Sequence, residues 1–223
     1  MVLEDDNFVA PTFLADNLGW MAAHDVAVVV NNQWLEVPGD DPAAAPRHAG
    51  QQANTSHVTG PWTADDFRLA LLWGLPLSNG SVFWRHGCRT DFGRDSGHDP
   101  ALHEWLRAWR LADPVYFNAT PNAFWYPSLP DGARPRHVGM GVFLQRERAL
   151  MAMRRSILAD LARRGETQKL LSGRYRTPLA EREEAVVRAG GRWPGPSLLP
   201  RRRRASLAAK ALALRLLMPA VPL

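Results

Sequence analysis

The chain contains very little cysteine and no long apolar stretch. Cys88 is its single cysteine among 223 residues, which excludes an internal disulfide and a zinc site built from several cysteines. Such usage is typical of a reducing compartment. No run of about 18 or more uncharged apolar residues occurs, so no ordinary membrane-spanning helix is predicted. The first residues lack the basic-then-apolar pattern of a secretory signal, and we expect a cytoplasmic location.

Negative charge is scarce in the second part of the chain. Residues 1–100 contain 5 Lys and Arg against 13 Asp and Glu, whereas residues 101–223 contain 22 against 9. This split favours an anionic partner for the basic part. Arg201–Arg204 precede an apolar helix expected at residues 205–218, which favours an anionic membrane surface at the cytoplasmic face; the alternative is a solvated basic tail. The chain contains no recognised nucleic-acid-binding module, so no nucleic-acid partner is expected.

Alternating helix and strand signals predict an α/β fold. Residues 11–23 are expected to form a helix, because Leu14, Leu18 and Met21 follow one another at helical spacing. The β-branched run that begins at Val26 predicts a buried strand continuing to residue 37. These two elements place a helix and a central strand at the start of the domain.

The rest of the chain divides by the same signals. Thr63 and Asp66 resemble a capping box at the start of a short helix that ends at Gly74. Further helices are predicted at 99–110, 142–164 and 178–189, strands at 81–84 and 115–117, and loops at 38–61, 86–98 and 118–137.

Three consecutive carboxylates, Glu4, Asp5 and Asp6, follow the apolar pair Val2 and Leu3. Clustered carboxylates repel one another unless a cation lies between them. Mg²⁺ prefers carboxylate oxygen and commonly brings a substrate phosphate as a further ligand. The segment therefore suggests a metal–phosphate site at a strand end; the alternative is a solvated acidic terminus.

The clearest helix signal lies at residues 99–110. Asp99 suits the cap position, with Pro100 in the first turn. Leu102, Trp105, Leu106 and Trp109 then form an apolar stripe. Glu104 lies off this stripe, where it is available either for chemistry or for a surface ion pair.

Three segments in this order resemble the C-terminal, acceptor-side half of family-2 glycosyltransferases of the GT-A fold. The first is the acidic strand end at residues 3–7 with its following helix. The second is residues 75–85, where a small-residue turn leads into a strand that ends in Trp84 and Arg85. The third is His103-Glu104-Trp105 followed by the strand from Asp113 to Phe117. The resemblance covers residues 1–126.

The resemblance implies a metal-dependent, inverting sugar transfer from a nucleotide-sugar to a hydroxyl. Glu4, Asp5 and Asp6 are expected to hold Mg²⁺ or Mn²⁺ against the donor's diphosphate. Glu104 corresponds to the general base, at a position where the family usually has Asp, and Asp99 is a second candidate base.

Acceptor and phosphate contacts are implied for three further side chains. Trp84 and Trp105 are expected to flank the acceptor sugar. Arg85 is expected either to meet a phosphate or to bridge a structural carboxylate. The acceptor implied is a carbohydrate or a lipid-linked molecule in polysaccharide or glycolipid synthesis.

The resemblance also predicts a partial GT-A fold with a C-terminal helical tail. We expect the acceptor-side half at residues 1–140, a helical extension at 141–192, and a Pro-rich linker with the basic and apolar tail at 193–223. The family's nucleotide-binding first half is expected upstream or on another polypeptide. The alternative function is that of a truncated, non-catalytic homologue that binds a partner or a membrane.

Overall fold

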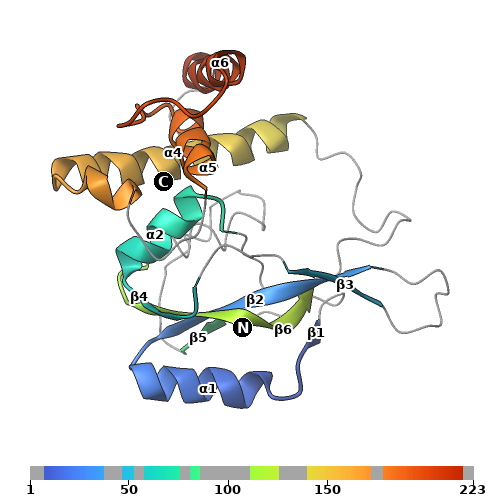
Figure 1. Ribbon diagram of the computed structural model, residues 1–223. Helices are drawn as coiled ribbons and strands as arrows, with labels where there is room; N and C mark the ends of the chain where they lie inside the picture. The colour runs from blue at the N-terminus through green and yellow to red at the C-terminus, as the bar shows by residue number, and fades with distance from the viewer. Residues whose placement is uncertain are drawn as a thin grey trace.

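The protein has an α/β fold, seen in a computed structural model (Figure 1). The structure describes residues 8–37, 47–52, 58–75, 81–85, 111–125, 140–171 and 178–217. The strands of its mixed sheet are β1 (Phe8–Val9), β2 (Val28–Val37), β3 (Arg47–Gln52), β4 (Gly60–Trp62), β5 (Val82–Trp84) and β6 (Val115–Trp125). The helices are α1 (Phe13–His24), α2 (Ala64–Leu72), α4 (Met140–Arg163), the 3-10 helix η2 (Thr167–Leu170), α5 (Leu179–Arg188) and α6 (Arg201–Leu217).

Two long parallel strands, β2 and β6, form the centre of the sheet. Four short antiparallel strands flank them. At the amino ends, β5 pairs with β2 and β4 pairs with β6. At the carboxyl ends, β3 pairs with β2 and β1 pairs with β6. Each end of the central pair is therefore bordered by its own two strands.

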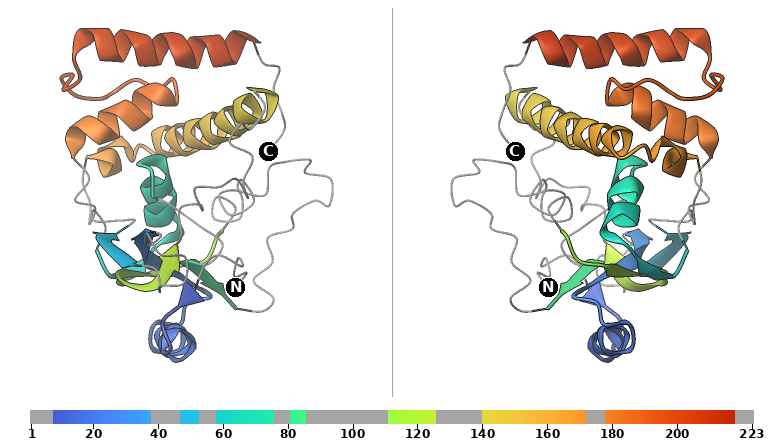
Figure 2. Two further views of the ribbon diagram at one scale, coloured as in Figure 1. Left: turned by 90° about the vertical axis from the view of Figure 1, so that its right-hand side faces the viewer. Right: turned by 90° about the vertical axis from the view of Figure 1, so that its left-hand side faces the viewer.

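The helices form layers on the two faces of this sheet (Figures 1 and 2). Helix α1 covers one face and α2 the other; α4 and α5 lie beyond α2, and α6 is the outermost layer. Alternation along β2 explains the division: Val28 and Val30 join the core under α2, whereas Val29 joins the cluster against α1.

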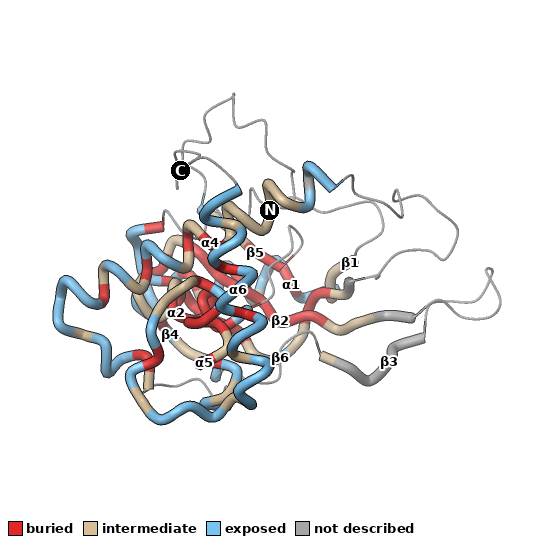
Figure 3. The backbone as a smooth tube through the Cα atoms, turned by 90° about the horizontal axis from the view of Figure 1, so that it is seen from above, coloured by how far each residue is buried: buried red, intermediate tan, exposed pale blue. Residues whose placement is uncertain are grey.

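One continuous core runs from the sheet through α2 into the C-terminal helices. Val30 of β2, Phe67 of α2, Ile157 of α4 and Val186 of α5 belong to the same buried cluster. This core crosses the boundary expected at residue 140, and the three-part domain division stays a prediction. Figure 3 shows that burial concentrates beneath α2, while α6 is exposed along most of its length.

Helix α1 is confirmed, but its buried face differs from the predicted one. Leu14 and Leu18 are 55% and 58% exposed, so the expected apolar stripe is wrong at these positions. The buried face consists of Phe13, Asn17 and Met21. Asn17 can be buried because its amide nitrogen donates to the carbonyl oxygen of Phe13 over 2.7 Å and its amide oxygen accepts from the sheet.

The predicted loops at 38–61 and 118–137 are wrong where the structure places β3, the start of β4 and the end of β6. Strand β3 has no apolar alternation, and Pro121 interrupts the strand signal in β6. These segments form strands because their backbones pair with other strands of the sheet, β3 with β2 and the end of β6 with β2 and β1. Sequence-local signals do not reveal such pairing.

The predicted capping box of α2 is confirmed. The Thr63 hydroxyl accepts from the backbone N–H of Asp66, and the Asp66 carboxylate accepts from the backbone N–H of Thr63, each over 3.1 Å. The helices predicted at 142–164 and 178–189 are also confirmed, as α4 and α5. The final helix begins at Arg201 rather than at residue 205, because Pro200 precedes it and the arginines form its first turn. No helix in the described ranges is long and apolar enough to cross a bilayer.

An ion network fastens α2 to α4. Arg164 donates to Asp65 over 2.6 Å and to Asp160 over 2.8 Å, while Arg68 lies 3.3 Å from Asp65. Burial raises the pKa of Asp65, but the hydrogen bond from Arg164 and the charges of Arg164 and Arg68 lower it, and the pKa lies below its usual value. The network therefore stabilises the fold most when Asp65 is ionised.

We expect Asp65→Asn to reduce the free energy of unfolding at pH 7 by about 1 kcal/mol, because partly exposed ion pairs contribute no more than this. The folded pKa lies below the unfolded value, so the contribution is present above about pH 4 and is lost as the pH falls through the folded pKa. Urea unfolding of both proteins at neutral and acid pH measures this. Asp16→Asn on α1 is the matched control. A difference that persists undiminished in acid contradicts the ion-pair explanation.

Candidate functional site

Most of the predicted site residues lie outside the residues that the structure describes. These are the metal ligands Glu4, Asp5 and Asp6, the candidate bases Asp99 and Glu104, and the acceptor residue Trp105. Trp84 and Arg85 are described. The nearest described residue to the acidic segment is Phe8, which opens β1 and pairs with Phe124 of β6.

Phe8 lies at the carboxyl end of the central parallel strands, because Phe124 in turn pairs with Trp34 of β2. In open α/β sheets, ligands bind in the crevice outside the carboxyl ends of parallel strands. Phe8, the first described residue after the acidic segment, therefore lies at the end of the sheet where a ligand is expected.

Arg85 lies at the opposite end of the sheet. Its neighbour Trp84 pairs with Val28, six residues before Trp34 along β2. At about 3.3 Å per residue this separates Trp84 from the level of Phe8 by roughly 20 Å. The structure therefore does not bring Arg85 together with the start of β1. The guanidinium of Arg85 donates to the carbonyl oxygen of Val26 over 3.3 Å.

Buried amide side chains cross the middle of the sheet. On the face covered by α1, the Asn31 amide nitrogen donates to the Asn17 amide oxygen over 2.9 Å and to the carbonyl oxygen of Ser81 over 3.3 Å. The Asn118 amide nitrogen donates to the Asn31 amide oxygen over 3.3 Å and to the carbonyl oxygen of Thr120 over 2.7 Å. This chain of amides joins α1, β2 and β6.

Asn32 extends the amides toward β3. Its amide nitrogen donates to the side chain of Gln52 and to the carbonyl oxygen of Ala119, each over 2.9 Å. Its amide oxygen accepts from the backbone N–H of Gln33 over 2.9 Å. The three consecutive amides of β2, Asn31, Asn32 and Gln33, are each no more than 3% exposed.

Among the buried amides described, Asn122 alone has a side chain without hydrogen-bond partners. It is 7% exposed, and neither its amide oxygen nor its amide nitrogen has a hydrogen-bond partner. Strand β6 is irregular here: Asn31 pairs with Asn118, but Gln33 pairs with Ala123, so β6 uses more residues than β2 over this step. A buried amide without partners is costly, and a polar ligand or water would satisfy it.

The amides of this region, Asn31, Asn32, Gln33, Asn118 and Asn122, can donate and accept hydrogen bonds without carrying charge. Asn31, Asn32 and Asn118 already use these functions in hydrogen bonds within the fold. Of the five amides, Asn122 is the one whose donors and acceptor remain for a ligand hydroxyl or a water. Sequence reasoning missed these residues by treating 31–33 as the continuation of a strand and 118–137 as a loop. The available signal was an Asn-Asn-Gln run in a strand, where Asn is unfavourable.

Neither metal-binding groups among the described residues nor similarity to known proteins assigns a function to this site. In the described ranges, no three His, Cys, Asp or Glu side chains gather as a metal-binding group; the acidic segment at residues 4–6 lies outside those ranges. Comparison with models of protein families, with curated protein sequences and with solved structures finds no match to this chain.

Proposed function

We propose that the chain is the acceptor-side half of a GT-A glycosyltransferase. Completed by the family's nucleotide-binding half, it transfers a sugar from a nucleotide-sugar to a hydroxyl of a carbohydrate or lipid-linked acceptor. The observation that supports this proposal is that the described strands within or next to the three resembling segments belong to one sheet. Strand β5 ends in Trp84 and pairs with β2, β2 pairs with β6, and β6 pairs with β1, directly after the acidic segment.

The donor set fits a hard divalent cation. Glu4, Asp5 and Asp6 supply carboxylate oxygens, the ligand type that Mg²⁺ and Mn²⁺ prefer. Phe8, which follows them in the sequence, lies at the carboxyl end of the parallel strands. A bound ion supplies charge neutralisation of the leaving diphosphate. Arg85 lies at the other end of the sheet from Phe8, so the proposal does not include Arg85 in this diphosphate contact.

Glu104 is the proposed general base, with Asp99 as the second candidate. The base takes the proton of the acceptor hydroxyl while that oxygen attacks the anomeric carbon, and a single displacement inverts this carbon. We assign Asn122 to positioning of the sugar, because its buried amide has unused donors and acceptors at the irregular part of β6. Arg201 and Arg202, exposed at the start of α6, favour an anionic membrane surface nearby.

The test uses Asp6→Ala in the full chain. We expect wild-type protein to bind one Mn²⁺ ion, measured by electron paramagnetic resonance. Together with the polypeptide that supplies the nucleotide-binding half, it should release nucleoside diphosphate from a nucleotide-sugar in the presence of Mn²⁺. Removal of one of three carboxylate ligands should reduce turnover by about 100-fold or more and weaken Mn²⁺ binding. Asp16→Ala is the matched control.

Equal Mn²⁺ binding and turnover in wild-type and Asp6→Ala proteins contradict the metal assignment. Mn²⁺ binding without turnover supports the alternative of a non-catalytic homologue. Absence of both in the wild-type chain contradicts the proposed function as a whole.

A further inference from the structure

A groove of about 600 Å³ runs between α4 and α6, on the far side of α2 from the sheet. We call it the α4–α6 groove. Its volume is within the usual range for small-molecule sites, roughly 300–1,000 Å³. Its lining residues come mostly from these two helices, with Arg188 contributed by α5.

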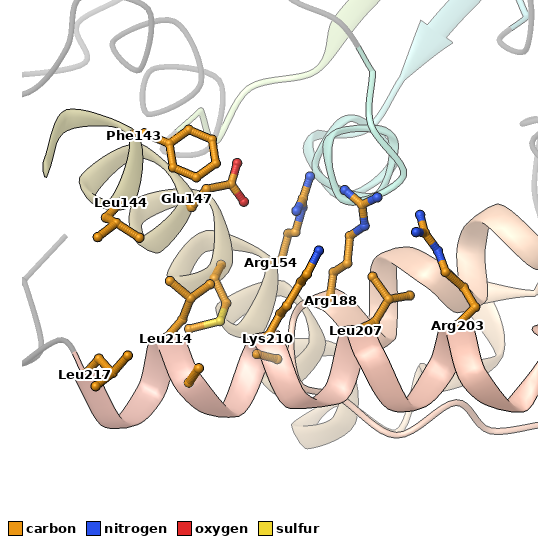
Figure 4. Close-up of a pocket in the computed structure, with 13 residues that line it drawn as sticks. Phe143, Leu144, Glu147, Arg154, Arg188, Arg203, Leu207, Lys210, Leu214 and Leu217 are labelled. Atoms are coloured by element: carbon orange, nitrogen blue, oxygen red, sulfur yellow. The ribbon is translucent and has the colours of Figure 1, made fainter. Parts of the chain in front are cut away.

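One end of the groove is apolar. Figure 4 shows Phe143 and Leu144, at the start of α4, opposite Leu214 and Leu217, at the end of α6. Phe143 is 48% exposed and Leu217 is 79% exposed. Exposed apolar side chains gathered in one place are typical of a binding surface, whereas elsewhere on proteins they are scattered singly.

The other end is basic. Arg154, Arg188, Arg203 and Lys210 extend into the same region in Figure 4. Among the described lining residues the single carboxylate is Glu147, which lies beside Phe143. Arg188 and Arg203 share the carboxylate of Glu184 at 2.5 and 2.9 Å. No ion pair in the described part of the chain involves Arg154 or Lys210. Cationic charge therefore exceeds anionic charge at this end.

Arg154 has unused hydrogen-bonding capacity. Its buried Nε atom has no partner. Burial lowers the pKa of Arg154, Glu147 nearby raises it and Arg188 lowers it, and the net shift is downward. A buried, unsatisfied guanidinium N–H is costly, and an anion bound at this end would accept from it.

We propose that the α4–α6 groove binds a single-chain lipid with a phosphate head, its alkyl chain against the apolar end and its phosphate at the basic end. Charge complementarity selects an anionic head, and the exposed apolar side chains gathered at the other end select a ligand that also has an alkyl chain. From Phe143 to Arg154 the helix advances about 16 Å, at 1.5 Å per residue, which suits an extended alkyl chain. This site is distinct from the sheet and does not rest on sugar transfer.

The probe is dodecyl phosphate below its critical micelle concentration, titrated into the full chain by isothermal calorimetry. We expect saturable binding of one molecule. Dodecyl maltoside has the same chain and a neutral head, and butyl phosphate has the same head and a short chain. Each should bind at least about tenfold more weakly, because each lacks one of the two interactions. Far-UV circular dichroism checks that the fold persists during titration.

Two pairs of variants on α6 locate the site. Lys210→Gln and Leu217→Ser change lining residues and should each weaken binding by about tenfold, through loss of a charge-assisted hydrogen bond or of apolar burial. Arg202→Gln and Leu216→Ser change exposed residues of the same helix that do not line the groove. These controls should stay within about twofold of wild type.

Three results would overturn the proposal. Equal losses in the lining and control variants would place the anion on the outer surface of α6, as binding to an anionic membrane requires. Equal affinity for dodecyl maltoside would remove the role of the phosphate. If a variant truncated after Leu217 binds dodecyl phosphate and the full chain does not, residues 218–223 occupy the groove in the full chain.

Discussion

Glu183→Ala should release α6 from the rest of the protein. Glu183 lies on α5 with its side chain fully buried. Its carboxylate accepts from the hydroxyl of Ser197 over 2.5 Å and from the backbone N–H groups of Leu198 and Leu199 over 2.5 and 3.0 Å. These residues form the linker that leads into α6, so one carboxylate fixes where the helix begins.

The expected loss is about 3 kcal/mol of unfolding free energy, because the variant removes a buried charged acceptor and with it three partly buried hydrogen bonds. Burial raises the pKa of Glu183, but the hydrogen bonds from Ser197, Leu198 and Leu199 lower it, and it lies below its usual value. The contribution is therefore present above about pH 4 and is lost as the pH falls through the folded pKa.

Hydrogen exchange of residues 201–217 and urea unfolding measure the effect. The adjacent Glu184→Ala is the matched control, because Glu184 makes partly exposed ion pairs with Arg188 and Arg203, which contribute at most about 1 kcal/mol. If α6 amides exchange equally slowly in Glu183→Ala and wild-type proteins, the carboxylate does not hold the linker. Because α6 forms one wall of the α4–α6 groove, the variant should also lose binding of dodecyl phosphate.

Elements with local signals could be predicted from the sequence. The α2 start followed from Thr63 and Asp66, whose hydrogen bonds join residues three apart. The central strand followed from the β-branched run at residues 26–30, and α4 and α5 lie where charge-rich helices were predicted. In each case the interactions that favour the element join residues that are close together in the sequence.

Elements that depend on distant partners could not be predicted. Strand β3 has a polar sequence and exists through its pairing with β2. The buried face of α1 was assigned to Leu14 and Leu18 by apolar period alone, but Asn17 is buried because it bonds to Asn31, fourteen residues away. A buried amide can only be recognised once its partner is known.

The candidate site shows the same limit more strongly. The acidic segment and Glu104 were found by pattern and lie outside the described residues, whereas the amides were overlooked. Asn31 and Asn118 are 87 positions apart and meet only because β2 and β6 are parallel neighbours. The Asn-Asn-Gln run in β2 carried the one usable signal: polar residues at positions where a buried strand was predicted.

Asn31→Asp should produce the second large effect, and its size should depend on pH. The substitution preserves the shape of the side chain but replaces the amide nitrogen that donates to Asn17 and Ser81. At pH 7 the new carboxylate would be an unpaired charge at a site that is 3% exposed. We expect a loss of at least about 3 kcal/mol, because both acceptors lose their donor and the charge loses its hydration.

The pH dependence of the stability of Asn31→Asp distinguishes the effect of the added charge from the effect of the lost hydrogen bonds. Burial raises the pKa of a carboxylate in the folded state above its unfolded value of about 3.9. The protonated form is then the better tolerated one, so stability is greatest below the unfolded pKa and falls as the pH rises through the folded pKa. Asn31→Leu is the matched control, since it removes the same hydrogen bonds without adding charge and should lose stability equally at pH 4 and pH 7. If the Asn31→Asp deficit is also the same at both values, the centre of the sheet is hydrated, and the amides there face solvent rather than a closed polar core.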